Sequence, residues 1–208
     1  MPYNRSEKLR RILIIALLAF VLLGAAFGIG LCAGNACTNH QPPFVQLKSY
    51  DEVKNAFKSN NQMLFPDLAA LELDESTVSY SVGYLSQNRR TANEYSVYGY
   101  RKLGGETVQF TLHCEDQSVF KAWGTQYSPV QYAEGRLFSI PDLRLETGNY
   151  SEDVFFRAGG HLYCLNAMFM PDSQKPPIDH NALIALKDEI HEIMLDYMNA
   201  LFEEVKAK

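Results

Sequence analysis

The stretch Glu94–Cys114 reads EYSVYGYRKLGGETVQFTLHC and decides the fold. Its second half alternates polar and apolar residues, which is the pattern of a strand with one buried side. Gly104 and Gly105 separate the two halves and are a strong signal for a two-residue hairpin turn. We therefore predict two antiparallel strands joined by this turn. The apolar side of the second strand carries Val108, Phe110, Leu112 and Cys114.

Similar patterns extend the sheet beyond this hairpin. A second hairpin is predicted where Gly159 and Gly160 separate two apolar runs. Its second arm is apolar on both faces, which is typical of a central strand. Pro141 is expected to break the segment before this hairpin into two weaker strands. The further predicted strands are Thr77–Gln87, Arg136–Ile140, Leu143–Glu146, Asp153–Arg157 and His161–Met170.

Two helices flank the predicted strands. Ser49 and Glu52 match a capping box, which predicts a short helix through about Lys58. Asp179 is the expected N-cap of a long C-terminal helix. The apolar residues of that helix recur at the spacing of one face: Leu183, Leu186, Ile190, Ile193, Met194, Tyr197 and Leu201. The expected fold class is α+β: a single N-terminal transmembrane helix, then a short helix, an antiparallel sheet of about five to seven strands and a long C-terminal helix packed on it.

Residues 12–34 form an apolar segment with no charged residue and no proline, long enough to span a bilayer as one helix. Arginines and lysine precede this segment, whereas the next basic residue after it is Lys48. That asymmetry predicts a cytoplasmic tail and an outer C-terminal part. The expected organisation is a cytoplasmic basic tail (1–11), a transmembrane anchor (12–34), a juxtamembrane linker (35–48) and an extracytoplasmic α+β domain (49–208).

Two alternatives to an uncleaved anchor remain open. The apolar segment is also compatible with a secretory signal peptide that is cleaved at a small-residue site. Cys32 suggests a lipoprotein, although Leu31 does not fit the small residue expected before a lipid-modified cysteine. Small residues four apart allow two membrane helices to pack closely, as in a homodimer. The residues with this spacing are Gly24, Gly28, Gly30 and Gly34.

The chain has four cysteines, and two of them lie on strong predicted strands. If the strands of Cys114 and Cys164 pair, the two sulfurs can meet on the core side and form a disulfide, which an extracytoplasmic location permits. The alternative is two separate buried thiols. No metal site is predicted, because strand alternation turns His113 away from Cys114 and His161 away from Cys164.

Composition and motifs exclude several functions. The 208 residues carry a formal net charge of -5, so no nucleic-acid partner is expected. The chain contains no nucleophile elbow, phosphate-binding loop or metalloprotease motif, and no catalytic residue or cofactor is predicted. The expected function is that of a membrane-anchored, non-catalytic module that binds or organises a protein or another component of the cell envelope. The alternatives are an extracytoplasmic hydrolase with scattered catalytic residues, or a secreted or lipoprotein form after signal cleavage.

Overall fold

The computed structural model describes residues 44–57, 63–84, 92–116, 134–172 and 178–207. All of them belong to one compact unit, Pro42–Lys208. The predicted transmembrane segment 12–34, with its spaced glycines and Cys32, lies outside the described residues, as does the basic tail. Within the described ranges, no helix is long and apolar enough to cross a membrane.

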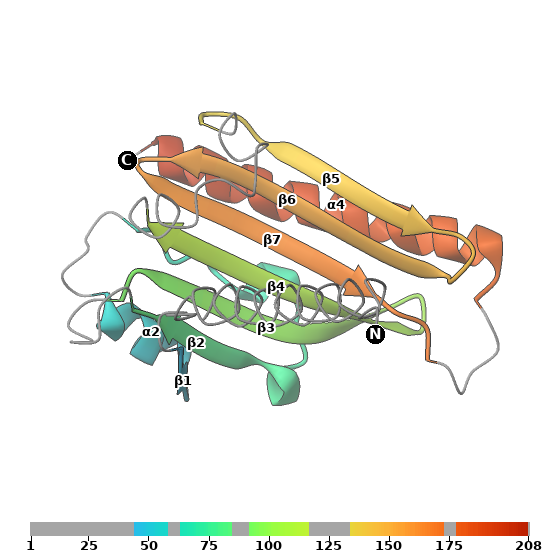
Figure 1. The fold of residues 1–208 in the computed structure, drawn as a ribbon, viewed down its shortest axis with the longest axis horizontal. Helices are drawn as coiled ribbons and strands as arrows, with labels where there is room; N and C mark the ends of the chain where they lie inside the picture. The colour runs from blue at the N-terminus through green and yellow to red at the C-terminus, as the bar shows by residue number, and fades with distance from the viewer. Residues whose placement is uncertain (1–43, 58–62, 85–91, 117–133, 173–177, 208) are drawn as a thin grey trace, which may run out of the picture. The chain divides into compact units, whose positions relative to one another are not determined.

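The described residues form a seven-stranded antiparallel sheet in the order β1-β2-β3-β4-β7-β6-β5 (Figure 1). Short connections join β2 to β3, β3 to β4, β5 to β6 and β6 to β7, and each of these pairs lies side by side. The long connection between β4 and β5 lets β7 take the place next to β4. The strands are β1 (Val45–Leu47), β2 (Ser79–Gly83), β3 (Glu94–Leu103), β4 (Glu106–Asp116), β5 (Phe138–Arg144), β6 (Asn149–Ala158) and β7 (His161–Phe169).

Both predicted glycine hairpins are confirmed. Gly104 and Gly105 have positive φ angles, as a type I′ turn requires, and they bring Leu103 opposite Glu106. The turn at 159–160 joins β6 to β7 in the same way. Because a two-residue loop has one length and one turn type, each turn fixes the register of the two strands that it joins.

Strand β5 corrects the prediction for Pro141. We expected this proline to separate two strands, but β5 runs through it, and Pro141 lies opposite Glu152 of β6. The physical reason is that β5 is an edge strand. A proline on an edge strand can direct its missing N–H away from the ladder, so that no hydrogen bond of the sheet is lost.

Two α-helices, α2 (Tyr50–Ala56) and α4 (His180–Lys206), begin at the predicted caps. The side chain of Ser49 accepts a hydrogen bond from the backbone N–H of Glu52, and that of Asp179 accepts one from Ala182. Two short 3-10 helices, η1 (Ala69–Leu71) and η2 (Glu75–Thr77), follow α2. The buried residues of α4 are Leu183, Leu186, Ile190, Met194, Tyr197, Met198, Leu201 and Phe202.

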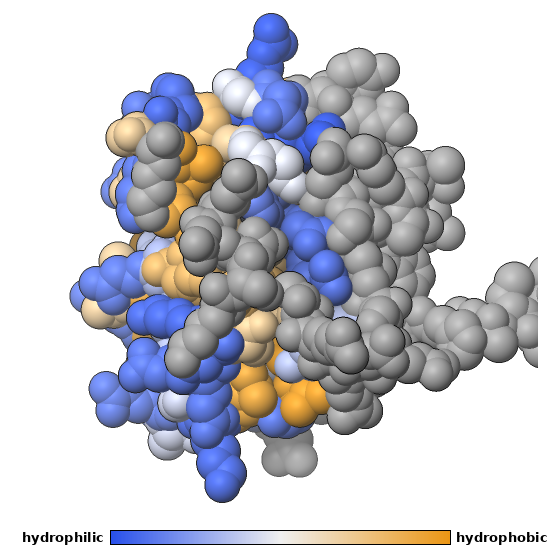
Figure 2. All heavy atoms as spheres, turned by 90° about the vertical axis from the view of Figure 1, so that its left-hand side faces the viewer, coloured by the Kyte–Doolittle hydropathy of each residue, from blue (hydrophilic) through white to orange (hydrophobic). Residues whose placement is uncertain are grey.

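The main core lies between the helices and one face of the sheet. In Figure 1, α4 runs behind the strands. Large side chains such as Tyr95, Phe110 and Phe156 point toward the helices and are fully buried, and each contributes about 1.5–3 kcal/mol of hydrophobic stabilisation. Figure 2 views one end of the molecule, where hydrophobic residues show in the middle and hydrophilic residues cover the outside. We call the opposite side of the sheet the open face, because neither described α-helix packs on it.

Candidate functional site

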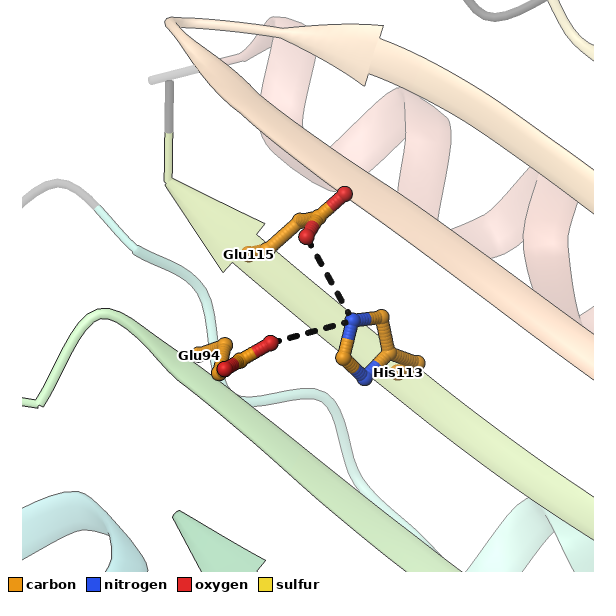
Figure 3. Close-up of side chains that lie close together, drawn as sticks. All are labelled: Glu94, His113 and Glu115. Carbon is orange, nitrogen blue, oxygen red and sulfur yellow. Dashed lines mark ion pairs between the residues drawn. The ribbon is translucent and has the colours of Figure 1, made fainter. Parts of the chain in front are cut away.

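Three side chains with charge or metal-binding chemistry lie together on the open face (Figure 3). Glu94 is the first residue of β3 and lies opposite Glu115 of β4. His113 lies two residues before Glu115, on the same face of β4. The Nε2 atom of His113 is 3.7 Å from Glu94 Oε2 and 3.6 Å from Glu115 Oε2. One donor atom from each residue lies within 4.8 Å of the other two. We call these three residues the open-face cluster.

Ser96 orients the imidazole of His113. The two residues are directly opposite each other in the β3–β4 ladder, and Ser96 Oγ is 2.7 Å from His113 Nδ1. When Nδ1 carries the proton and donates it to this hydroxyl, the Nε2 lone pair points toward the two carboxylates. The distances from Nε2 to the carboxylates exceed the hydrogen-bond length of about 2.7–3.2 Å. The three groups of the cluster therefore face each other across a gap.

Glu94 is the most buried member of the open-face cluster. Its side chain is 6% exposed, and its Oε1 atom has no hydrogen-bond partner in the described part of the chain. Burial raises the pKa of the Glu94 carboxyl group, the positive charge of His113 lowers it, and the negative charge of Glu115 raises it further. A buried acceptor without a partner costs about 1–3 kcal/mol, and like charges opposite each other in a ladder are also destabilising. His113, when protonated, pairs with both carboxylates, and a cation bound in the gap would offset their repulsion further.

Gly83 makes room for the side chain of Glu94. The two residues lie opposite each other in the β2–β3 ladder. A Cβ atom at position 83 would lie 2.7 Å from Glu94 Cδ and closer still to Oε1. Atoms cannot approach so closely without strong repulsion, so any larger residue at position 83 would displace the carboxylate. The glycine thus allows the Glu94 side chain to lie over β2.

An apolar patch adjoins the cluster on its β7 side. Cys164 of β7 lies opposite His113, and Phe155 of β6 lies opposite Cys164. The ring of Phe155 stacks on that of Phe138 of β5, with 5.9 Å between the ring centroids. Leu162, on the same face of β7, completes the patch. These neighbours supply few polar groups, so charges in the cluster interact more strongly than they would in water.

A second buried carboxylate lies on the core side of the sheet. The Glu152 side chain is fully buried and accepts hydrogen bonds from the hydroxyls of Ser139 and Tyr150. His191 Nδ1 of α4 is 2.7 Å from its Oε1 atom. Serine, glutamate and histidine thus lie together, but the Glu152 carboxylate lies between Ser139 and His191. In a hydrolytic triad the histidine lies between the serine and the carboxylate. This network fastens α4 to β5 and β6 and does not activate the serine.

The predicted disulfide between Cys114 and Cys164 is corrected, because both cysteines are free. Strands β4 and β7 do pair, but the register places His113, not Cys114, opposite Cys164. This offset of one residue turns Cys114 to the core and Cys164 to the open face, so the sulfurs cannot meet. Burial raises the pKa of both thiols. His161 lies on the core face, and the predicted divergence of the histidines from the cysteines is confirmed.

The chain matches no known family model, no curated protein and no solved structure. A function must therefore follow from the chemistry of its own residues. Among the described residues, the open-face cluster is the group of three His, Cys, Asp or Glu side chains whose donor atoms converge.

Sequence reasoning missed Glu94, Ser96 and Glu115, because it considered each strand alone. A signal for them was present in the glycine turn at 104–105. Counting back from that turn along both strands places Glu94 opposite Glu115 and Ser96 opposite His113, as the structure has them. Residues 113 and 115, two apart on one strand, necessarily share a face.

Proposed function

We propose that this chain is a single-pass membrane protein whose outer domain is a cation-binding module, with the ligand between Glu94, His113 and Glu115. The observation that carries the proposal is the pair of carboxylates on neighbouring strands, one of them buried, with a single imidazole between them. Two carboxylates this close repel each other, and only the imidazole of His113 offsets that repulsion among the described residues. Bound positive charge turns that repulsion into attraction.

The membrane part of the proposal rests on the sequence. Residues 12–34 are uncharged and apolar, and the basic residues before them favour a cytoplasmic tail. The outer domain would then meet its ligand on the extracytoplasmic side. The glycines spaced four residues apart in this segment would also let it pack closely against a second copy of itself.

Binding without catalysis fits the surroundings of the cluster. In hydrolytic sites a general base usually assists the attacking water. The described neighbours on the β7 side include Cys164, Leu162, Phe155 and Arg157. Burial raises the pKa of the Cys164 thiol, which keeps it protonated. One oxygen of each carboxylate in the cluster faces the gap, so neither group stands apart as a base for a bound water.

One observation favours a second candidate, a serine hydrolase. Ser96 Oγ, His113 Nδ1 and the carboxylate near Nε2 follow in the order nucleophile, base and acid. The backbone argues against this candidate. Both β3 and β4 have a paired strand on either side at this point, so their N–H groups serve the ladders and do not form an oxyanion hole.

A fluorophosphonate probe separates the two candidates. We expect no labelling of the full chain in detergent micelles. Labelling that maps to Ser96 and disappears in S96A would instead establish a serine hydrolase and overturn the binding proposal.

A panel of cations tests the binding proposal. Thermal unfolding of the full chain would be followed at constant ionic strength with magnesium, calcium, manganese, zinc or a small organic diamine. We expect at least one of these cations to raise the melting temperature of the wild type, and the effect to be lost in E94Q and E115Q. No rise with any cation, or equal rises in wild type and variants, would overturn it.

Proteolysis of intact cells tests the membrane placement separately. We expect added protease to remove the region after Pro43 and to spare the basic tail. Protection of the outer domain in intact cells, or recovery of the full-length chain in the soluble fraction, would contradict the placement.

A further inference from the structure

We propose that Glu94, His113 and Glu115 bind one divalent transition-metal ion, and that zinc is the ion this donor set favours. The proposal names the ligand of the cation-binding module and therefore rests on the proposed function. One imidazole nitrogen with two carboxylate oxygens is a donor set that suits zinc and related metals. Magnesium and calcium prefer sites made of oxygen ligands alone.

The three donors that form ion pairs when His113 is protonated are also spaced closely enough to share a metal ion. Zinc binds nitrogen and oxygen donors at about 2.0–2.1 Å, which places two donors of a tetrahedral site about 3.3–3.4 Å apart. His113 Nε2 lies 3.6 Å from one carboxylate oxygen and 3.7 Å from the other. Small side-chain movements would close these gaps around an ion, whereas both distances are too long for hydrogen bonds.

Ser96 supplies the outer contact that metal-binding histidines use. A ligating imidazole normally donates its second N–H to an acceptor, which holds the ring in place and leaves the other nitrogen free for the metal. Ser96 Oγ, 2.7 Å from Nδ1, takes that position. Ser96 is a positioning residue here, because it acts through His113 and does not touch the ion.

Glu94 is buried at the edge of the gap, and its Oε2 atom faces His113. Its side chain is 6% exposed, and Oε1, which lies beside Gly83, has no hydrogen-bond partner among the described residues. Gly83 is the residue that permits this placement. A divalent ion balances the two formal charges of Glu94 and Glu115. His113 and Glu115 remain 30% and 15% exposed, so a fourth position is left for water or for a donor from a partner.

Equilibrium dialysis of the full chain in detergent micelles tests the proposal. Cys32 and Cys37 would be changed to serine throughout, so that their thiols do not bind zinc. We expect one zinc per chain in this background. We expect E94Q, E115Q and H113A each to weaken zinc binding at least tenfold. H180A removes an exposed histidine of α4 and is the matched control, with unchanged affinity.

Two further variants distinguish a metal site from a structural role. S96A is expected to weaken zinc binding about tenfold, as loss of an outer-shell partner does, and S96T, which keeps the hydroxyl, is expected to restore it. C164S is expected to leave zinc binding unchanged. If C164S abolishes binding and E94Q does not, zinc sits on the thiol and the proposal is wrong.

The outcomes separate this inference from the proposed function. Zinc binding that depends on all three residues supports both. If another cation binds through Glu94 and Glu115 but H113A has no effect, the proposed function stands and the transition-metal site is overturned. If the wild type, E94Q and E115Q have the same metal-free circular dichroism spectrum and none of them binds a cation, the proposed function and the zinc site are both overturned.

Discussion

Glu94 and Glu115 face each other across the β3–β4 ladder, and His113 Nε2 lies within 3.7 Å of a carboxylate oxygen of each. Two carboxylates in this position repel each other, and Glu94 is buried with no described partner for its Oε1 atom. Natural sheets usually place opposite charges or apolar pairs at such sites. The glycine at position 83 shows that the backbone accommodates the buried carboxylate. The contact between Gly83 and Glu94 can therefore be tested by mutation of either residue.

The effects of mutating Gly83 and Glu94 on the free energy of unfolding are predicted to be non-additive. G83A should lower the free energy of unfolding by about 1–3 kcal/mol, because the new methyl group overlaps the Glu94 side chain. In E94A the obstructing atoms are gone, so adding G83A should cost much less. Urea unfolding of the two single variants and the double variant gives the coupling energy, which should exceed about 0.5 kcal/mol. Additive effects would show that the two side chains do not compete for one space.

Glu152 is predicted to contribute to stability from the core side. E152Q replaces an acceptor oxygen by an amide that faces hydroxyl donors, so it should lower the free energy of unfolding by about 1–3 kcal/mol. Glu203 is exposed and pairs only with Lys206 among the interactions described, so E203Q is the control and should change stability by less than about 0.5 kcal/mol. Equal effects of the two variants in urea unfolding would refute a role for Glu152 in holding α4.

His161 is predicted to make the fold less stable in mild acid. Burial lowers its pKa below the ordinary 6.5, while Asp116 acts in the opposite direction. As the pH falls below about 6.5, the unfolded chain therefore takes up the proton before the folded chain does. Stability present at neutral pH is lost as the pH falls through the folded-state pKa, with a slope of up to about 1.4 kcal/mol per pH unit.

The comparison of H161Q with the wild type between pH 7.5 and 5 isolates this effect. H161Q should lose less stability than the wild type over that interval, and H180Q, at an exposed position, is the control. An unchanged pH dependence in H161Q would show that this histidine is not held neutral by the fold.

The free cysteines give a chemical prediction. Without reductant, denatured protein should be alkylated at both Cys114 and Cys164, and peptide mapping by mass spectrometry should find both modified. Reductant should leave the melting temperature unchanged. A cross-linked peptide that joins the two cysteines would contradict the register of β4 and β7.

Local patterns in the sequence predicted much of the fold. Alternation and the glycine turns identified the strands of both hairpins, and Ser49 and Asp179 marked the starts of both helices. The pairing of β4 with β7 has no such local signal, because a long connection separates them. The disulfide prediction failed for this reason: a shift of one residue in that register moves Cys164 to the other face.

The open-face cluster lies between these two cases. Its register follows from the turn at 104–105, so the Glu94–Glu115 pairing was within reach of sequence reasoning. The burial of Glu94 was not, because it depends on the contact with Gly83 on a third element. Motif searches also miss such a site, because its residues come from two strands and match no ligand spacing.

The most direct test of the central claim is a crystal structure of the compact unit Pro42–Lys208 grown with zinc, with diffraction data collected on both sides of the zinc absorption edge. The account predicts an anomalous peak between His113 Nε2 and the carboxylates of Glu94 and Glu115, with Nδ1 bound to Ser96. A zinc-saturated crystal with no peak there, or with zinc bound only elsewhere, would contradict it.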